Sequence, residues 1–129
     1  MAQKKIVLCD TNILIELAKN NQEIIKELEA IGQENIAISA ITAGEMIFGA
    51  LNKAELSKIK KSLNSVSIIQ VNEAISEIAL ELQENYSLSH NLTIPDALIA
   101  ATALEEGVEL FTLNQKDFKF ISQIKLYQG

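Results

Sequence analysis

Aspartate is scarce in this chain, and its positions are the first candidates for chemistry. The 129 residues include 17 acidic side chains, of which only three are aspartate: Asp10, Asp96 and Asp117. The rest are glutamate, which suits the solvated face of a helix, whereas aspartate suits caps and turns. Taken one at a time, each aspartate is explained by a structural role at the end of an element. Together with Glu45 they predict a carboxylate site, provided that the fold brings them together.

The elements that must position these acids alternate between strand and helix. Short β-rich apolar runs predict five strands, over residues 5–9, 36–38, 67–71, 109–112 and 124–127. Apolar residues at helical spacing predict helices between them, over residues 13–18, 24–31, 41–51, 53–63, 75–86 and 97–104. This alternation is typical of an α/β fold with a mostly parallel sheet and helices on both faces. We expect one domain over residues 1–129, because the sequence has no linker, repeat or low-complexity tract.

The three aspartates fall where parallel sheets form their sites, outside the carboxyl ends of the strands. Asp10 directly follows the strand predicted over residues 5–9, and Asp117 follows the strand at 109–112 by a short turn. Asp96 lies in the first turn of the helix that leads into that same strand. If the first and fourth strands are central neighbours, Asp10 and Asp117 leave the sheet at one edge, and Asp96 reaches the pocket from its helix end.

Glu45 differs from the other glutamates in its surroundings. It lies one turn into the helix that follows the strand at 36–38. Ile41, Glu45 and Phe48 are spaced i, i+4, i+7, so this acid shares a helix face with apolar residues, whereas a surface glutamate normally lies opposite them. We therefore include Glu45 in the predicted site.

Four carboxylates in one pocket require a counter-charge. At low dielectric they repel one another by several kcal/mol unless a cation lies among them. Oxygen ligands without a cysteine or histidine partner favour a hard divalent ion, Mg²⁺ or Mn²⁺. Such an ion can polarise a phosphoryl oxygen and supply hydroxide as the nucleophile, which needs no histidine, cysteine or serine nucleophile. The residues therefore predict metal-dependent phosphoryl chemistry, and the sequence contains no convincing catalytic triad.

Composition narrows the remaining classes of protein. With 11 lysines, no arginine and a net charge of −6, the chain lacks the basic footprint of an ordinary nucleic-acid binder. A single cysteine excludes an internal disulfide and suits a reducing compartment. No apolar run approaches the ~20 residues that span a bilayer, and the four apolar residues from Ile6 to Cys9 are too few for a signal peptide. We expect a cytoplasmic protein without a membrane partner.

Four short segments resemble those of a known family. The segments are Leu8-Cys9-Asp10-Thr11-Asn12, Ser39-Ala40-Ile41-Thr42-Ala43-Gly44-Glu45, Pro95-Asp96-Ala97-Leu98-Ile99-Ala100-Ala101 and Leu113-Asn114-Gln115-Lys116-Asp117-Phe118. In this order and spacing they resemble PIN-domain proteins, in particular the VapC-type ribonuclease toxins of prokaryotic toxin–antitoxin modules. Each segment alone is a weak signal, but the four together cover essentially the whole chain.

The resemblance implies a fold and an activity. The fold is a PIN-like three-layer sandwich with a five-stranded sheet in the order 3-2-1-4-5. The activity is divalent-metal-dependent cleavage of RNA at Asp10, Glu45, Asp96 and Asp117. A homodimer and a small antitoxin that blocks the pocket are also implied. The family's usual rim of basic side chains for binding RNA would have to consist of lysines here, because the chain has no arginine. The candidates are Lys53, Lys58, Lys60, Lys61, Lys116 and Lys119.

We assign expected roles within this predicted site. Asp10 and Asp96 are the expected direct metal ligands. Glu45 and Asp117 are expected to ligate a second ion, hold metal-bound waters or orient the attacking water. Caps and turn residues beside the acids are expected to aim the carboxylates; these are Thr11, Asn12, Thr112 and Asn114.

Three alternatives belong to other functional classes. A non-catalytic RNA- or protein-binding module on the same fold is disfavoured by the four intact acids. A haloacid-dehalogenase-type phosphatase requires a second aspartate two residues after the first, and this chain has Asn12 at that position. A receiver domain requires a pair of acidic residues before its phosphorylated aspartate, and no such pair precedes Asp10.

Overall fold

The sheet is parallel throughout, and Asp10 directly follows one of its two interior strands. The computed structural model describes residues 5–129. The prediction that the chain has no signal peptide involves residues 1–4, which lie outside the described residues. The strands are β1 (Val7–Cys9), β2 (Ile36–Ser39), β3 (Ser67–Ile69) and β4 (Glu109–Phe111), in the spatial order β3-β2-β1-β4. Leu8 pairs with Ala37 on one side and with Leu110 on the other. The predicted neighbourhood of the first and fourth strands is therefore confirmed.

The predicted fifth strand is wrong in its extent. Residues 124–127 contribute one isolated parallel bridge, Leu110 to Leu126, with two hydrogen bonds at 2.8 and 2.9 Å to the main chain of Leu110. The chain turns at Gln123, whose φ is 68°, directly before this segment. Tyr127 then packs its ring on Phe111 and donates its hydroxyl to Glu27 Oε2 at 2.8 Å, so the pairing does not continue.

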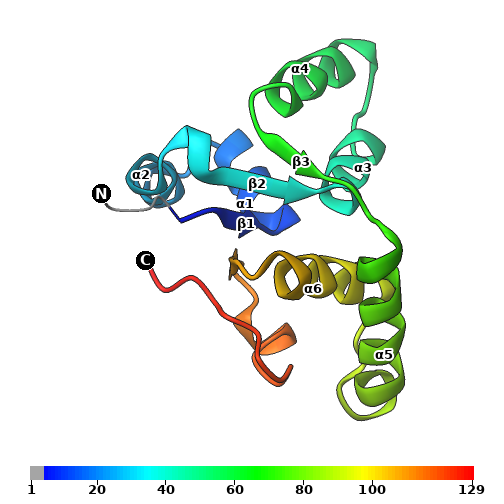
Figure 1. Cartoon of the computed structure of the whole chain (residues 1–129). Helices are drawn as coiled ribbons and strands as arrows, with labels where there is room; N and C mark the ends of the chain where they lie inside the picture. Colours follow the sequence, from blue (N-terminus) through cyan, green and yellow to red (C-terminus); the bar gives the residue numbers. More distant parts are fainter. Residues whose placement is uncertain (1–4) are drawn as a thin grey trace.

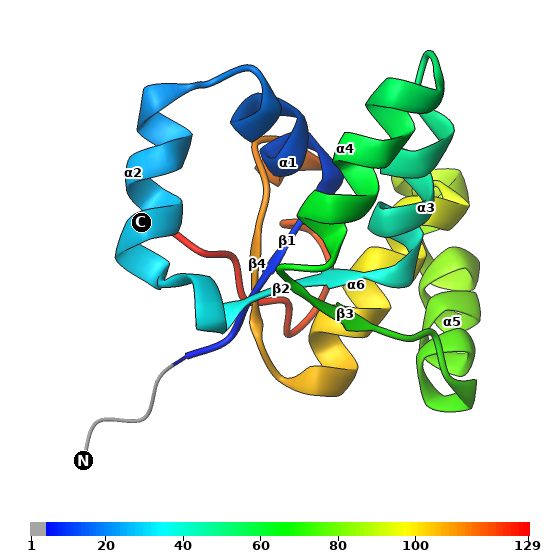
Figure 2. The same cartoon turned by 90° about the horizontal axis from the view of Figure 1, so that it is seen from above.

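The helices cover both faces of the sheet, as predicted. They are α1 (Thr11–Ala18), α2 (Gln22–Ile31), α3 (Ala40–Phe48), α4 (Lys53–Leu63), α5 (Glu73–His90) and α6 (Ile94–Glu106), with 3₁₀ turns η1 (Gln33–Asn35) and η2 (Gln115–Asp117). Figure 1 shows α4 above the strands and α5 and α6 below them, and Figure 2 gives the view from above. The three-layer α/β prediction is confirmed.

The alternation of side chains along each strand divides the core in two. Leu8, Ala37 and Leu110 point to the face covered by α5 and α6. Their sequence neighbours, such as Val7 and Ile38, point to the face covered by α1 to α4. Because both faces are buried, the strands read as nearly continuous apolar runs, which is why they were recognisable in the sequence.

Helix α6 is held rigidly, which fixes the position of Asp96. Its body is buried at Ala97 and again from Ile99 to Ala103. Thr93 caps its first turn by accepting the main-chain N–H of Asp96 at 3.3 Å. The helix ends at Gly107, whose φ of 66° suits glycine.

Within residues 5–129, no helix is both long enough and apolar enough to cross a membrane.

Candidate active site

Asp10 is the buried centre of the site. Its side chain is only 6% exposed, and its main-chain N–H donates to Phe111 O at 2.9 Å, which extends the pairing of β1 with β4. It caps α1, because its Oδ1 accepts the N–H of Thr11 at 2.8 Å. Its Oδ2 accepts the Thr112 hydroxyl at 2.8 Å and the Asn12 amide at 3.4 Å. These three donors, from the start of α1 and from the residue that follows β4, hold the carboxylate in one orientation.

Thr112 links the end of β4 to this carboxylate. Its buried hydroxyl donates to Asp10 and accepts from two groups, the N–H of Asn114 at 3.1 Å and the side-chain amide of Asn12 at 3.4 Å. Asn12 in turn accepts the N–H of Leu113 at 3.3 Å through Oδ1. The hydroxyl proton and both lone pairs of Thr112 are thus used, so this residue can occupy only one rotamer without losing a bond.

Thr11 joins Asp10 to Glu45. Its main chain donates to Asp10, and its hydroxyl donates to Glu45 Oε1 at 2.6 Å and contacts the hydroxyl of Thr42 at 3.1 Å. Glu45 itself is exposed, on α3. Through Thr11, two carboxylates that are 35 positions apart in sequence are therefore oriented by one residue.

Asp96 and Asp117 complete the group from two helical turns. Asp96 lies in the first turn of α6, and Asp117 ends η2, where its N–H donates to Asn114 O at 2.9 Å. Both side chains are half-buried. Asn114 therefore acts through its main chain, both toward Thr112 and toward Asp117.

The charges of the other three acids act on Asp96. Burial, followed by the negative charges of Asp10, Asp117 and Glu45, raises the pKa of Asp96 to about 6. Burial also raises the pKa of Asp10, as do Glu45 and Asp117, while the bonds from Thr112 and Thr11 oppose the rise. Asp96 thus lies within electrostatic range of the other three predicted acids, at the edge of the sheet where Asp10 ends the pairing of β1 with β4.

The arrangement of the donors decides what the site can hold. Within residues 5–129, no three histidine, cysteine, aspartate or glutamate side chains stand close enough to hold a metal ion as a preformed cage. The oxygen-only donors and the mutual repulsion of the acids nevertheless fit Mg²⁺ or Mn²⁺. Mg²⁺ commonly keeps several waters and binds through one or two carboxylates plus substrate phosphate.

Two details differ from the sequence interpretation. Phe48 is 91% exposed, so the face of α3 that carries Glu45 is not a core face; Glu45 faces the site because Thr11 holds it there. Thr42, which was given no role, is fully buried behind Thr11. Its position three residues before Glu45 on the same helix is the signal that could have identified it.

Cys9 is excluded as a nucleophile. Burial, together with the charge of Asp10, raises the pKa of its thiol to about 12. At neutral pH the thiol is protonated and therefore unreactive. Cys9 is an apolar strand residue, as predicted.

A family model for the PIN domain matches residues 7–122 of this sequence. The chain belongs to the PIN-domain family. It is 34% identical to ribonuclease VapC10 of Mycobacterium tuberculosis over 91 residues, which are 70% of this chain and 68% of that protein. It is also 23% identical to the tRNA(fMet)-specific endonuclease VapC of Shigella flexneri over 123 residues, covering 92% and 93% of the two chains.

Solved structures also resemble this PIN domain over most of its length. A chain of a toxin–antitoxin complex from Klebsiella pneumoniae matches this PIN domain with a TM-score of 0.79 and 35% identity, over 95% of this chain and 99% of that one. A chain of VapBC2 from Rickettsia felis, bound to a DNA fragment from its promoter, matches with a TM-score of 0.81 and 29% identity, over 95% and 97%. The likeness thus extends over almost the whole of this PIN domain.

Replacing Thr112 by valine tests how the Asp10 carboxylate is held. The variant keeps the shape of the side chain but loses the hydroxyl that donates to Asp10. Since that bond favours the charged form, we expect the pKa of Asp10 to rise above its wild-type value. Carboxyl-carbon NMR titration measures this directly, because this PIN domain has only three aspartates to assign.

Thr102→Val is the matched control for that experiment. Thr102 is also fully buried, and its hydroxyl donates to Leu98 O at 2.7 Å, within α6. We expect the pKa of Asp10 to be unchanged in this control. An unchanged pKa in Thr112→Val as well would show that Thr112 does not hold the carboxylate.

The pH dependence of stability tests the charge crowding at Asp96. Its pKa is about 6 in the folded chain against an ordinary 3.8, so between these values the folded state binds more protons than the unfolded state. The free energy of unfolding therefore falls as pH rises through this window. Asp96→Asn removes that loss, and without divalent ions we expect the variant to be more stable than wild type at pH 7 by about 1 kcal/mol, since solvent screens a half-buried group.

Urea unfolding at pH 4 and pH 7 measures this difference. The advantage of Asp96→Asn should shrink at pH 4, where much of the wild-type repulsion is relieved by protonation. A matched control is Glu105→Gln, an exposed acid at the other end of α6. If Asp96→Asn were less stable than wild type at pH 7, the carboxylate would be stabilised in its site rather than crowded.

Proposed function

We propose that this PIN domain is a divalent-metal-dependent endoribonuclease and the toxin of a type II, VapBC-like toxin–antitoxin system. Its substrate is RNA, and its cofactor is Mg²⁺ or Mn²⁺. Asp10 and Asp96 serve as direct metal ligands, while Glu45 and Asp117 hold a second ion or waters. The protein acts in the cytoplasm as a homodimer, and a small cognate antitoxin inhibits it.

The observation that carries this proposal is the electrostatic coupling of the four acids. Asp96 has a pKa of about 6 because it is partly buried beside Asp10, Asp117 and Glu45. Such crowding costs stability, and a divalent cation among the oxygens would offset it. A surface that only bound RNA would have no need of this arrangement.

The chain's own residues prepare the site for hydrolysis. The bonds from Thr112 and Thr11 favour the charged form of Asp10 and so keep it available as a ligand near neutral pH. Glu45 accepts the Thr11 hydroxyl through Oε1, which leaves its other oxygen to orient a water. When bound, Mg²⁺ or Mn²⁺ supplies Lewis-acid polarisation of a phosphoryl oxygen and a water of lowered pKa.

Relatives support the choice of RNA and of an antitoxin. The Mycobacterium tuberculosis relative is named a ribonuclease, and the Shigella flexneri relative a tRNA(fMet)-specific endonuclease. Structural neighbours include VapBC assemblies and a toxin–antitoxin complex. We extend RNA hydrolysis and inhibition by an antitoxin from these proteins to this chain.

Incubation with total cellular RNA tests the proposal. The purified chain should produce discrete new 5′ ends with Mg²⁺ or Mn²⁺ and none with EDTA, as mapped by end sequencing. Asp96→Asn should lower the cleavage rate by about 10²-fold or more, because it removes a charge that stabilises the bound ion. The rate should stay at the wild-type level in Glu105→Gln, which changes the same charge on the same helix.

The outcomes separate the proposed enzyme from a binding module. RNA that is bound but never cut, with any divalent ion, would indicate a non-catalytic module on a PIN fold. Cleavage of equal rate in EDTA would contradict the metal dependence. Wild-type activity in Asp96→Asn would contradict the assignment of the site.

A further inference from the structure

Three of the seven aromatic side chains, counting histidine, form one cluster. The chain has four phenylalanines, two tyrosines, one histidine and no tryptophan. His90 stacks on Phe120, with the ring centroids 4.1 Å apart and the ring planes at 14° to each other. Tyr86 lies edge-to-face with both rings, its centroid 5.8 Å from that of His90 and 5.1 Å from that of Phe120. We call these three residues the aromatic cluster.

The outer face of the aromatic cluster is open to solvent. His90 is exposed, whereas Phe120 behind it is only partly exposed. Because Tyr86 is close to both centroids of the stack, it lies beside the stack and not over the outer face of His90. The Ser89 hydroxyl contacts His90 Nδ1 at 2.7 Å, and across residues 5–129 no hydrogen bond uses Nε2. One face of the imidazole and its Nε2 are therefore available to a ligand.

His90 lies close to the start of the helix that carries Asp96. It is the last residue of α5, and α6 begins four residues later, at Ile94. The turn between the two helices is fixed, because Leu92 is buried and its carbonyl oxygen accepts the side-chain amide of Gln83 at 2.5 Å. His90 is thus held six residues before Asp96, at the same end of α6 as the acidic site.

Phe120 lies close to the 3₁₀ turn that carries Asp117. It follows Asp117 by three residues, and the N–H of Lys119 donates to Gln115 O at 2.8 Å, which keeps this stretch in a tight turn. Three residues span at most about 10 Å between Cα atoms, even when they are extended. About three stacked nucleotides, at roughly 3.4 Å each, cover that distance. A strand that is cleaved at the acids can therefore place one of its bases at the aromatic cluster.

The two segments that form the aromatic cluster do not repel a nucleic acid. Residues 85–95 and 118–129 contain no acidic side chain, although the chain has 17. Within residues 5–129, the other contact between aromatic rings joins Phe111 to Tyr127, and the Tyr127 hydroxyl donates to Glu27 Oε2 at 2.8 Å. A nucleotide at that second ring pair would meet a carboxylate, which disfavours a phosphate there.

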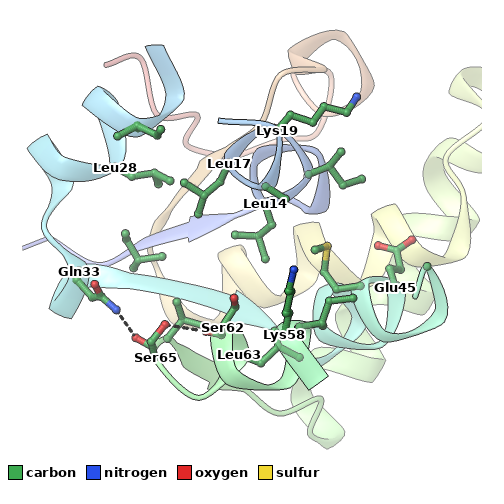
Figure 3. A pocket seen from close by; sticks show the side chains of 18 of the residues that line it. Leu14, Leu17, Lys19, Leu28, Gln33, Glu45, Lys58, Ser62, Leu63 and Ser65 are labelled. Atoms are coloured by element: carbon green, nitrogen blue, oxygen red, sulfur yellow. Dashed lines mark hydrogen bonds between the residues drawn. The ribbon is translucent and has the colours of Figure 1, made fainter. Parts of the chain in front are cut away.

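The large cavity of the molecule does not offer an aromatic surface. It measures about 1100 Å³ and lies between α1 and α2 on one side and α3 and α4 on the other. Figure 3 shows aliphatic side chains around it, such as Leu14 and Leu28, with Glu45 at its border, and none of its lining residues within 5–129 is aromatic. Proteins hold unpaired bases on aromatic faces, so the cavity is the poorer place for a base.

We propose that the aromatic cluster is a nucleobase subsite, in which an unpaired base of the RNA substrate stacks on the open face of His90. This inference rests on the proposed ribonuclease function and adds a contact that positions the strand beside the acids. Unpaired RNA bases commonly stack on aromatic or histidine rings and form hydrogen bonds through their edges. His90 Nε2 can supply such a bond, while Phe120 and Tyr86 support the imidazole from behind and from the side. Stacking needs no positive charge, which suits a chain of net charge −6 without arginine.

Two fluorescent strands of equal charge test the subsite. One is a short single-stranded oligoadenylate, and the other is the same ribose–phosphate backbone without bases. All proteins carry Asp96→Asn so that the RNA stays intact. Adding His90→Ala should lower the affinity for the oligoadenylate by about tenfold, because one stacked base is lost. The affinity for the strand without bases should not change.

Further variants separate stacking from bulk. His90→Phe keeps an aromatic face and should retain the affinity for the oligoadenylate, whereas His90→Leu covers Phe120 without such a face and should lose affinity as His90→Ala does. Leu88→Ala is the matched control, because it removes a fully exposed side chain two residues away on the same helix. We expect unchanged affinity in this control. Circular dichroism melting confirms that each variant is folded.

The outcomes distinguish this inference from the proposed function. An equal loss of affinity for both strands in His90→Ala, or full affinity in His90→Leu, would overturn the stacking of a base on His90. If the wild-type chain cleaves RNA but His90→Ala binds the oligoadenylate normally, the subsite is wrong and the ribonuclease remains. If the wild-type chain neither binds nor cleaves RNA, the proposed function fails, and the subsite fails with it.

Discussion

The parallel pairing of β1 with β4 places Asp10 and Thr112 side by side at one edge of the sheet. The N–H of Asp10 continues the pairing by donating to Phe111 O at 2.9 Å, and the Thr112 hydroxyl then reaches Asp10 Oδ2 at 2.8 Å. Asp117 follows within one 3₁₀ turn because it continues from the same strand. Without this pairing, residues about 100 positions apart in the chain would have no common edge on which to meet.

The site places negative charges together at a cost in stability. Desolvation and repulsion raise the pKa values of Asp10 and Asp96, while the bonds from Thr112 and Thr11 oppose the rise at Asp10. These hydrogen bonds keep the buried carboxylate ionisable without removing its neighbours. Functional sites commonly show such crowded, shifted acids, because chemistry needs charges that folding alone would not bring together. On this account the cation is the partner that relieves the crowding.

Much of the fold and the acidic cluster followed from the sequence for identifiable reasons. Asp10, Asp96 and Asp117 stand at element ends that are marked by buried runs and a capping threonine, so their common edge could be inferred from parallel topology alone. The extent of residues 124–127 could not, because their pairing is ended by tertiary contacts of Tyr127 with Phe111 and Glu27. Similarly, periodicity placed Phe48 on a core face, but exposure depends on which elements cover a helix, and the structure leaves it 91% exposed. The spacing along α3 could place Thr42 beside Glu45, but it could not reveal the contact with Thr11, because that contact joins two different helices.

Anomalous scattering from a crystal grown with Mn²⁺ tests the central claim most directly, because it locates the ion without reference to activity. The account predicts a manganese peak at the carboxyl edge of the sheet, in contact with carboxylate oxygens of Asp10 or Asp96. A crystal at saturating Mn²⁺ with no peak among Asp10, Glu45, Asp96 and Asp117 would contradict it.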